Sequence, residues 1–336
     1  MTAPTEDDWQ RVVGLLAAAP RVALACHVGP DGDALGSMLA LGAGLRARGA
    51  EVVASWGGEP FVVPAAYSFL TAVDLLVPPA QFPEAPELLV TLDTGSPDRL
   101  GSLAGRLDRA GCTVVVDHHA NGVPYGDVRL VDTTAAATVV LVTGLLDRLG
   151  ISLTQETATP LYTGLVTDTG SFKYLATTPD VHHLAGRLLA TGIRHDLISR
   201  AIYDTAPFGY VQLLGRACGR AVLEAGAAGG LGLVWTVVDA ADYEGTGLGL
   251  ADVEGVIDVL RVAEEAEVAL VLKADPVGGG WKVSTRSKGA IDVGVLCGAL
   301  GGGGHRFAAG FSAQDDVAAV VAQVRAALVD APHLPR

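Results

Sequence analysis

The stretch "CTVVVDHHANG", residues 112–122, decides the fold of the first half of this chain. Its first five residues form an apolar, β-branched run that is typical of a buried strand. The run ends abruptly in three titratable side chains, Asp117, His118 and His119. Acids and imidazoles are seldom buried without a partner, so their place where a strand ends indicates a binding or catalytic edge.

Strand-like runs of this kind alternate with helical segments through the first half of the chain. The apolar runs are residues 21–27, 50–56, 87–93 and 112–117, and helical spacing is found at 33–49, 134–149 and 154–192. Alternation of strand and helix predicts an α/β fold, with a mostly parallel sheet and helices on both of its faces. A short helix is also expected after "TGSPDR" (94–99), between the third and fourth strands.

The alternation of predicted strands and helices changes after "EAGAAGGLG" (224–232), a segment whose small residues are typical of a domain boundary. Beyond it the pattern predicts a strand at 231–238, a helix at 249–263, a hairpin at 266–289, a helix at 291–300, a glycine loop at 301–304, a strand at 306–313 and a helix at 315–329. We therefore expect a catalytic domain at 1–193, a helical linker at 194–228 and a smaller α/β domain with a mixed sheet at 229–336. The active-site cleft is expected between the two domains.

Composition narrows the class of protein. Half of the 336 residues are apolar, which is enough for sizeable cores, and the longest apolar run (135–146) is too short to span a bilayer. The first ten residues are acidic and do not resemble a secretion signal, so we expect a cytoplasmic protein with no membrane association. The four cysteines are far apart in sequence, and we expect small buried residues rather than disulfides or a zinc site.

The net charge of −14 bears on the ligand. Long nucleic acids bind through many contacts from Lys and Arg to phosphates, so this charge argues against a long duplex partner. A small phosphorylated ligand remains compatible with it, provided that cations gather in one cleft.

Acids and imidazoles recur at the ends of three apolar strands of the first half, in the turn after the first of these strands, and after an apolar helical stretch near residue 168. They are His27, Asp31, Asp33, Asp93, His118 and Asp168. In open parallel sheets, ligands bind outside the carboxyl ends of the strands. Taken singly, these acids also suit turns and helix caps, but their coincidence at one edge favours a metal site. Mn²⁺, Fe²⁺, Co²⁺ or Zn²⁺ fits mixed carboxylate and imidazole ligands, and the number of ligands predicts two ions that share one bridging acid.

Six segments of the chain resemble the motifs of one known family. "HVGPDGDALGS" (27–37), "LDTGSPDRLG" (92–101), "VDHHANG" (116–122) and "GLVTDTGSF" (164–172) resemble the four motifs of the DHH phosphoesterases, and "STRSKG" (284–289) and "GGGGHRFAAGF" (301–311) resemble their DHHA1 domain. The motifs occur in the family's order over nearly the whole chain. Length and domain order are most similar to the NrnA-type oligoribonucleases and 3′-phosphoadenosine-5′-phosphate phosphatases, some of which cleave cyclic di-AMP.

This resemblance implies a ligand set for two metal ions, with Mn²⁺ as the usual metal. One ion would be held by His27, Asp31 and Asp93, and the other by Asp33, Asp93, His118 and Asp168. Asp93 would bridge the two. His119 would face the scissile phosphate as a catalytic residue, and Asp117 would orient the histidines.

The resemblance also implies a nucleotide clamp in the second domain. Arg286, Ser287, Gly303, Gly304 and His305 would bind the nucleotide end away from the metals, and Lys288 is a lesser candidate. Without the resemblance, the glycine run reads as a flexible loop and Arg286 equally well as a surface arginine. The remaining histidines match no motif and are expected on helix surfaces or in the core; they are His182, His183, His195 and His333.

Three positions depart from the family pattern. Gly29 replaces a frequent Asn, and Thr285 replaces a frequent Leu. Residues 137–140 read Ala-Thr-Val-Val where relatives often have Ser-Thr-x-Glu, so Thr138 is kept and the acid is lost.

The function expected from the resemblance is a hydrolase of phosphoester bonds. Its substrates would be 3′-phosphoadenosine-5′-phosphate, short oligoribonucleotides or cyclic di-AMP, attacked in line by a metal-bridging hydroxide. A homodimer is expected on the same ground. The alternatives are a RecJ-like single-strand exonuclease, which would carry extra domains and a basic channel, a family II inorganic pyrophosphatase, which has a different second domain, and a non-catalytic nucleotide sensor.

Overall fold

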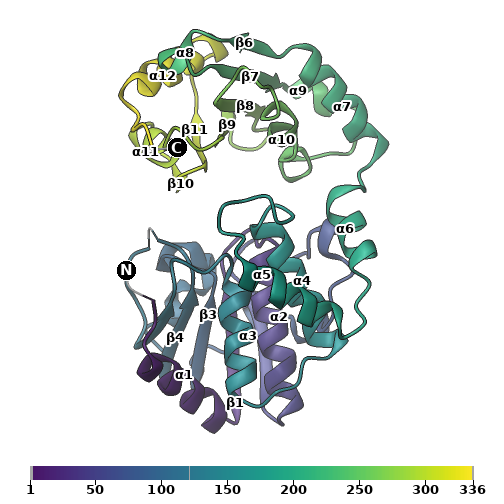
Figure 1. Cartoon of the computed structure of the whole chain (residues 1–336), viewed down its shortest axis with the longest axis vertical. Coiled ribbons are helices and arrows are strands. Elements are labelled where there is room, and N and C mark those ends of the chain that lie inside the picture. Colours follow the sequence, from purple (N-terminus) through teal and green to yellow (C-terminus); the bar gives the residue numbers. More distant parts are fainter. Residues whose placement is uncertain (1–2, 121, 335–336) are drawn as a thin grey trace. The chain divides into compact units, whose positions relative to one another are not determined.

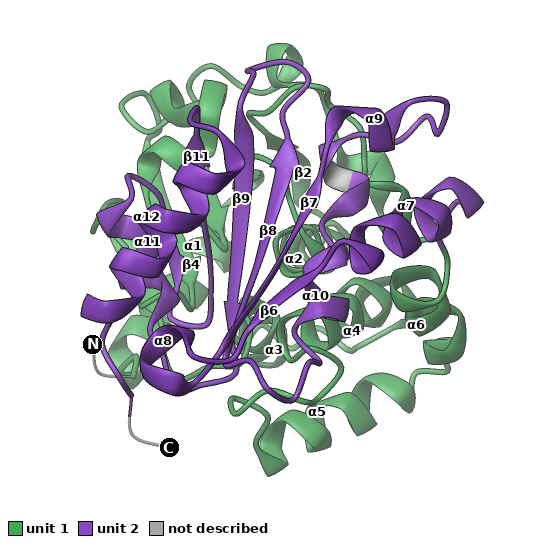
Figure 2. Cartoon of the chain, turned by 90° about the horizontal axis from the view of Figure 1, so that it is seen from above, with its two compact units in different colours: residues 1–205 green, residues 206–336 purple. Residues whose placement is uncertain are grey.

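The structure is a computed structural model that describes residues 3–120 and 122–334, so Asn121 of the VDHHANG motif lies outside the described residues. The chain divides into two compact units, residues 1–205 and 206–336, coloured separately in Figure 2. This division lies inside the predicted linker 194–228: α6 (His195–Tyr203) belongs to the first unit and α7 (Phe208–Gly219) to the second.

The first unit is built on a five-stranded parallel sheet with the order β2-β1-β3-β4-β5. The strands are β1 (Arg21–Cys26), β2 (Glu51–Trp56), β3 (Leu88–Leu92), β4 (Cys112–Asp117) and β5 (Val128–Val131). The first four confirm the predicted runs, whereas the four residues of β5 are too few to show a period in the sequence. From β1 the chain moves outward to β2 and then returns to β3 on the other side of β1. A topological switch point therefore lies between β1 and β3, where ligands of open α/β sheets bind.

The α-helices of this unit pack on one face of the sheet (Figure 1). They are α1 (Glu6–Ala18), α2 (Gly32–Ala47), α3 (Thr138–Arg148), α4 (Gln155–Asp168) and α5 (Pro179–Leu189), together with α6, which packs against α4. The other face is covered in part by η4 (Pro97–Arg106), a 3-10 segment that contributes Leu100 and Leu103. Further 3-10 turns are η1 (Ala65–Tyr67), η2 (Val73–Leu75) and η3 (Pro79–Gln81). Gly101 has φ +57° and interrupts η4, so the short helix predicted there does not form an α-helix.

Two glycines bring α2 and α4 unusually close together. A Cβ on Gly36 of α2 would overlap the Pro160 carbonyl oxygen of α4, and a Cβ on Gly164 of α4 would lie 2.9 Å from the Asp33 carboxylate. Only glycine permits this approach without displacement. As a result, Asp33 near the start of α2 and Asp168 at the end of α4 lie in the same region of the unit.

The second unit contains a six-stranded mixed sheet with the order β10-β11-β9-β8-β7-β6. Its strands are β6 (Val222–Glu224), β7 (Leu233–Val238), β8 (Val268–Ala274), β9 (Trp281–Ser287), β10 (Gly303–His305) and β11 (Ala308–Ala313). The predicted hairpin is confirmed as the antiparallel pair β8–β9. The predicted glycine loop is wrong in part, because Gly303 and Gly304 pair with β11 as β10.

Helices pack on both faces of this sheet, but on one face they cover only the β7–β8 part. They are α8 (Ala227–Gly230), α9 (Ala240–Tyr243), α10 (Val256–Leu260), α11 (Val293–Ala299) and α12 (Val317–Asp330), with a 3-10 turn η5 (Leu250–Val253). α11 and α12 pack on one face, and α7 and α10 pack on the β7–β8 part of the other. The helix predicted at 249–263 is divided into η5 and α10.

The four cysteines form no disulfide, and only Cys26 and Cys297 are fully buried. Cys112 and Cys218 are half-buried, which corrects the expectation for those two. Among the described residues, no helix is long and apolar enough to cross a membrane.

Candidate metal centre and nucleotide-binding face

The candidate metal centre lies at the carboxyl ends of three neighbouring strands. β1, β3 and β4 are adjacent in the sheet, and His27, Asp93 and His118 are the residues that directly follow them. His27 Nε2 is 3.5 Å from Asp93 Oδ2, and His118 Nε2 is 3.6 Å from Asp93 Oδ1. The two oxygens of one carboxylate therefore face two different imidazoles, as a bridging ligand requires.

The first group of potential ligand atoms belongs to His27, Asp31 and Asp93, all within 4.8 Å of one another. His27 Nδ1 lies 3.0 Å from the Val28 carbonyl oxygen, which suits a proton on Nδ1, and 3.0 Å from the donor Arg99 Nη2, which suits the other tautomer. Nε2 is 3.8 Å from Asp31 Oδ1. Asp31 also caps α2, because its side chain accepts hydrogen bonds from the backbone of Asp33 and Ala34. The turn interpretation and the ligand interpretation of Asp31 are thus compatible.

The second group belongs to Asp33, His118 and Asp168. His118 Nε2 lies 3.1 Å from Asp168 Oδ2 and 3.9 Å from Asp33 Oδ2. His118 Nδ1 is 3.2 Å from the Ala135 carbonyl oxygen, so here too Nε2 points toward the acids. The six residues predicted as metal ligands therefore fall into two groups, and Asp93 of the first group lies 3.6 Å from His118 of the second.

Asp93 has an unusual backbone conformation, with φ +55°. Asp tolerates this left-handed region better than most residues. Its N–H still donates to the Val116 carbonyl oxygen at 3.0 Å, so the chain leaves the sheet only at this residue. The turn places the carboxylate, which is 2% exposed, between the two histidines.

The protonation states of these residues reflect crowded buried charge. Burial, with the charges of Asp93 and Asp168, raises the pKa of Asp33 well above its usual range. Burial is also the main cause that raises the pKa of Asp168 to about 6. Burial opposes protonation of His27, but Asp31 and Asp93 outweigh it and raise its pKa to about 10. The centre therefore attracts protons in the absence of other cations.

This donor set fits two divalent cations. Asp31, Asp33, Asp93 and Asp168 supply four negative charges, which two divalent ions would neutralise, and the two imidazoles present Nε2. Mixed oxygen and imidazole ligands are typical of Mn²⁺, Fe²⁺, Co²⁺ and Zn²⁺ sites.

His119 is oriented by Asp117. Its Nδ1 lies 2.7 Å from Asp117 Oδ1, the oxygen that also accepts the backbone N–H groups of His118 and His119 at 2.9 and 3.3 Å. The same Nδ1 is 3.6 Å from Asp93 Oδ1, and His119 forms a third close group with Asp93 and His118. Burial opposes its protonation, but the hydrogen bond to Asp117 contributes to a raised pKa. The bond to Asp117 occupies the nitrogen of His119 that faces Asp93.

Two residues beside the centre were missed at the sequence level. Arg99 belongs to the motif 92–101 but was given no role, and its Nη2 lies 3.0 Å from His27 Nδ1, because η4 returns the chain to the end of β1. The sequence showed only that Thr138 is kept from the family pattern and indicated no contact for it. In the structure its hydroxyl donates to Asp93 Oδ1 at 2.9 Å. Neither contact follows from periodicity, because each joins segments that are far apart in the chain.

In the second unit, Arg286 and the glycine segment meet in one row of the sheet. Arg286 on β9 pairs with Ala308 on β11, and Ala308 pairs with His305 on β10. Residues directly opposite each other in antiparallel strands point to the same face, so Arg286 and His305 share a face. Gly303 and Gly304 are exposed in β10, and a Cβ on Gly304 would lie 2.6 Å from the Ala309 Cα.

Ser287 does not join this row. It is 3% exposed, and its hydroxyl donates to Glu267 at 2.8 Å and accepts the N–H groups of Gly289 and Ile291. Successive residues of a strand point to opposite faces, so Ser287 faces away from the Arg286 side. The Ser287 hydroxyl therefore lies within the turn after β9, and its role as a substrate ligand stays a prediction. The exposed Lys288 donates to the Ala263 carbonyl oxygen.

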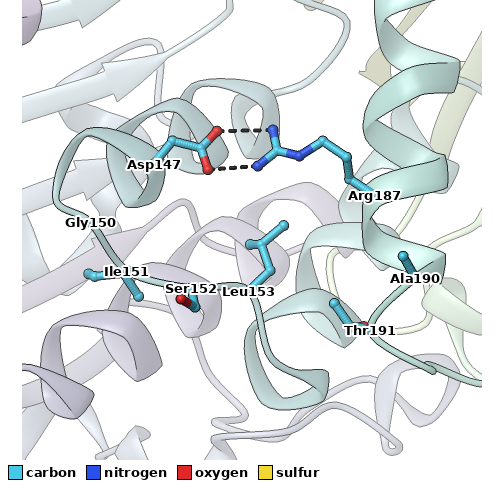
Figure 3. A pocket seen from close by; sticks show the side chains of 8 residues that line it. All are labelled: Asp147, Gly150, Ile151, Ser152, Leu153, Arg187, Ala190 and Thr191. Carbon is cyan, nitrogen blue, oxygen red and sulfur yellow. Dashed lines mark hydrogen bonds and ion pairs between the residues drawn. The ribbon is translucent and has the colours of Figure 1, made fainter.

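A separate hollow of about 590 Å³ lies at the C-terminal ends of α3 and α5 (Figure 3). Its charged residues Asp147 and Arg187 pair with each other through two hydrogen bonds of 3.0 and 2.7 Å. Their charges are therefore satisfied within the protein, and the described residues that line the hollow offer no unpaired charge to a ligand. His182 and His183 lie nearby in sequence and are exposed on α5, and His195 and His333 are exposed as well.

Comparisons with known proteins identify the family of this chain. The model of the DHH family, N-terminal domain, matches residues 21–165, and that of the DHHA1 domain matches residues 240–330. The bifunctional oligoribonuclease and PAP phosphatase NrnA of Thermus thermophilus is 33% identical over 85% of this chain and 82% of its own length. The cyclic-di-AMP phosphodiesterase GdpP of Geobacillus thermodenitrificans is 30% identical over 65% of this chain and 32% of its own length.

Among solved structures, an exopolyphosphatase-related protein from Bacteroides fragilis is similar over 97% of this chain and 96% of that one. The TM-score is 0.88 and the sequence identity is 21%, so the likeness is one of fold.

Proposed function

This chain belongs to the DHH family of phosphoesterases and carries the DHHA1 domain, and from this premise we propose that it hydrolyses small nucleotide phosphoesters with two divalent cations. Its substrates would be 3′-phosphoadenosine-5′-phosphate and short oligoribonucleotides, with cyclic di-AMP as a third. The observation that carries the proposal is Asp93, whose two oxygens lie 3.5 and 3.6 Å from imidazole nitrogens on two different strands.

The metal ligands are proposed as two sets that share Asp93. His27 and Asp31 complete the first set, and Asp33, His118 and Asp168 complete the second. When bound, two divalent cations, with Mn²⁺ as the first candidate, would supply Lewis-acid activation of water and of the scissile phosphate. The chain itself contributes ligands that are already oriented, because both histidines have their Nδ1 atoms directed at backbone carbonyl oxygens.

His119 is proposed as the protein group that contacts the reacting phosphate. Asp117 holds its imidazole through Nδ1 and contributes to its raised pKa, which favours the protonated ring. A protonated imidazole donates a hydrogen bond and stabilises negative charge that grows on phosphate oxygens during the reaction. Asp117 would then act through His119 and not on substrate.

Arg286 and the β10 segment are proposed to bind the nucleotide end that does not react. A guanidinium suits a terminal phosphate, and the β10 glycines allow a close approach to the backbone. Binding energy at a remote phosphate is useful because it positions the reacting one.

The test is turnover of the three substrates in parallel, with Mn²⁺ and with EDTA. We expect Mn²⁺-dependent release of phosphate from 3′-phosphoadenosine-5′-phosphate, of mononucleotides from a trinucleotide, or of a linear or monomeric product from cyclic di-AMP. The ranking of kcat/KM identifies the preferred substrate. Absence of turnover for all three, in protein that contains two Mn²⁺ ions, would overturn the proposal and favour a nucleotide sensor.

A further inference from the structure

We propose that Thr138 is a positioning residue that holds the bridging carboxylate of Asp93 and the carboxylate of Asp33 in place for two cations. The inference rests on the proposed metal centre. Its basis is one short segment, the start of α3, that makes three hydrogen bonds to two different ligands of that centre.

The start of α3 has no capping side chain of its own, because its N-cap residue is Ala137. The first N–H groups of a helix need acceptors. Here the N–H of Thr138 donates to Asp33 Oδ2 at 2.6 Å, and the N–H of Val139 donates to Asp33 Oδ1 at 3.0 Å. Both oxygens of Asp33 are therefore fixed by a helix that begins more than a hundred residues later.

The Thr138 hydroxyl makes the third bond, to Asp93 Oδ1 at 2.9 Å. This is the oxygen that faces His118, whereas Oδ2 faces His27. A hydrogen bond to Oδ1 limits rotation of the carboxylate. It therefore keeps Oδ1 facing His118 and Oδ2 facing His27. Thr138 and Asp33 are 0% exposed and Asp93 is 2% exposed, so solvent does not compete for these bonds.

Two other buried threonines on the helices of this unit behave differently. Thr143, also on α3, donates its hydroxyl to the Val139 carbonyl oxygen at 2.8 Å, and Thr163 on α4 donates to Thr159 at 2.9 Å. These are bonds within one helix, the usual choice for threonine in a helix. Thr138 instead reaches another element, and it does so at the bridging ligand. Thr143 is therefore a matched control with the same residue type, helix and burial.

The experiment is a Mn²⁺ titration by calorimetry, with electron paramagnetic resonance to detect two interacting Mn²⁺ ions. In Thr138→Val, which removes the hydroxyl and keeps the shape, we expect affinity for at least one ion to fall about 10- to 100-fold, as for other groups that orient metal ligands. The signal of the interacting pair should weaken accordingly. Thr138→Ser keeps the hydroxyl and should bind both ions nearly as the wild type does, and Thr143→Val should do the same.

Several outcomes would overturn the inference. Equal Mn²⁺ affinities in Thr138→Val, Thr143→Val and wild type would show that the hydroxyl does not position Asp93. An equal loss in both valine variants would show a general packing effect. If Thr138→Val does not fold, Thr138→Ala against Thr143→Ala makes the same comparison. Because metal binding is read without substrate, a wild type that binds two ions but turns over none of the three substrates leaves this inference standing and overturns only the proposed function. A wild type that binds no Mn²⁺ overturns both.

Discussion

Replacement of Asp93 with asparagine tests the bridging arrangement most directly. At φ +55° asparagine is tolerated about as well as aspartate, so Asp93→Asn should keep the turn out of β3. The substitution also keeps one carbonyl oxygen as an acceptor for the Thr138 hydroxyl. It removes one negative charge that is 2% exposed and that faces both histidines.

The size of the effect can be worked from Coulomb's law. At about 4 Å and an effective dielectric constant of about 20, a unit charge and a divalent ion attract each other by about 8 kcal/mol. If solvent and the remaining carboxylates compensate half of this, about 4 kcal/mol is lost for each ion, which is roughly a thousandfold in affinity. Because Asp93 is shared, both ions should be affected, whereas loss of Asp31 or Asp168 should affect chiefly one.

The assay is metal content after dialysis against Mn²⁺ at a concentration that saturates the wild type, together with thermal unfolding. Asp93→Asn should contain neither ion in stoichiometric amount, and Mn²⁺ should no longer raise its melting temperature. In the metal-free state near neutral pH it should be less stable than the wild type, because the three surrounding histidines outweigh burial and hold the pKa of Asp93 below its usual range, so that its charge is favoured in the folded chain. Asp93→Ala should be less stable than Asp93→Asn by about 1 kcal/mol, since alanine is strained at this φ. Retention of two ions with affinities within about tenfold of the wild type would refute the bridging role, given the magnitude above.

The remaining parts of the site are tested by two substitutions and one change of pH. His119→Asn should lower kcat by about 10²- to 10³-fold while both ions stay bound, and loss of an ion would instead make His119 a ligand. Arg286→Ala should raise KM about tenfold or more with unchanged metal content, whereas Lys282→Ala, on the same face of β9, should change KM little; similar values for the two would argue against the clamp. In metal-free protein, thermal stability should fall as the pH rises from 5 to 9. The folded pKa of Asp168, about 6, and of His27, about 10, exceed their ordinary values, so the stability that these protons provide is present below the ordinary pKa and is lost as the pH rises through the folded one. Mn²⁺ should remove or reverse this trend because it replaces those protons, and a metal-free protein that gains stability from pH 5 to 9 would contradict the raised values.

The positions of the strand ends could be predicted from the sequence because each strand is a continuous run of apolar residues. β1, β3 and β4 are apolar runs, and a parallel sheet brings the ends of such runs to one edge, so the cluster around Asp93 follows from pattern and topology. The contacts of Thr138 and Arg99 depend instead on how a helix and a 3-10 segment return to that edge, which no period in the sequence encodes. Ser287 is a different case. Period-two alternation already separates its side chain from that of Arg286, but the shared motif obscured this.

The same residues that make the centre chemically useful make it costly for the folded chain. Asp33, Asp93 and Asp168 are held close together by strand ends and by the glycine contacts between α2 and α4, and burial raises the pKa of two of them. The structure offsets part of this cost locally, because the first N–H groups of α3 donate to Asp33 in place of a capping side chain. One carboxylate thus serves as a helix cap and as a proposed metal ligand. This arrangement explains why the orientation of the Asp33 carboxylate is maintained before any cation binds. It also explains why a substitution at the start of α3 should change the affinity for the metal ions.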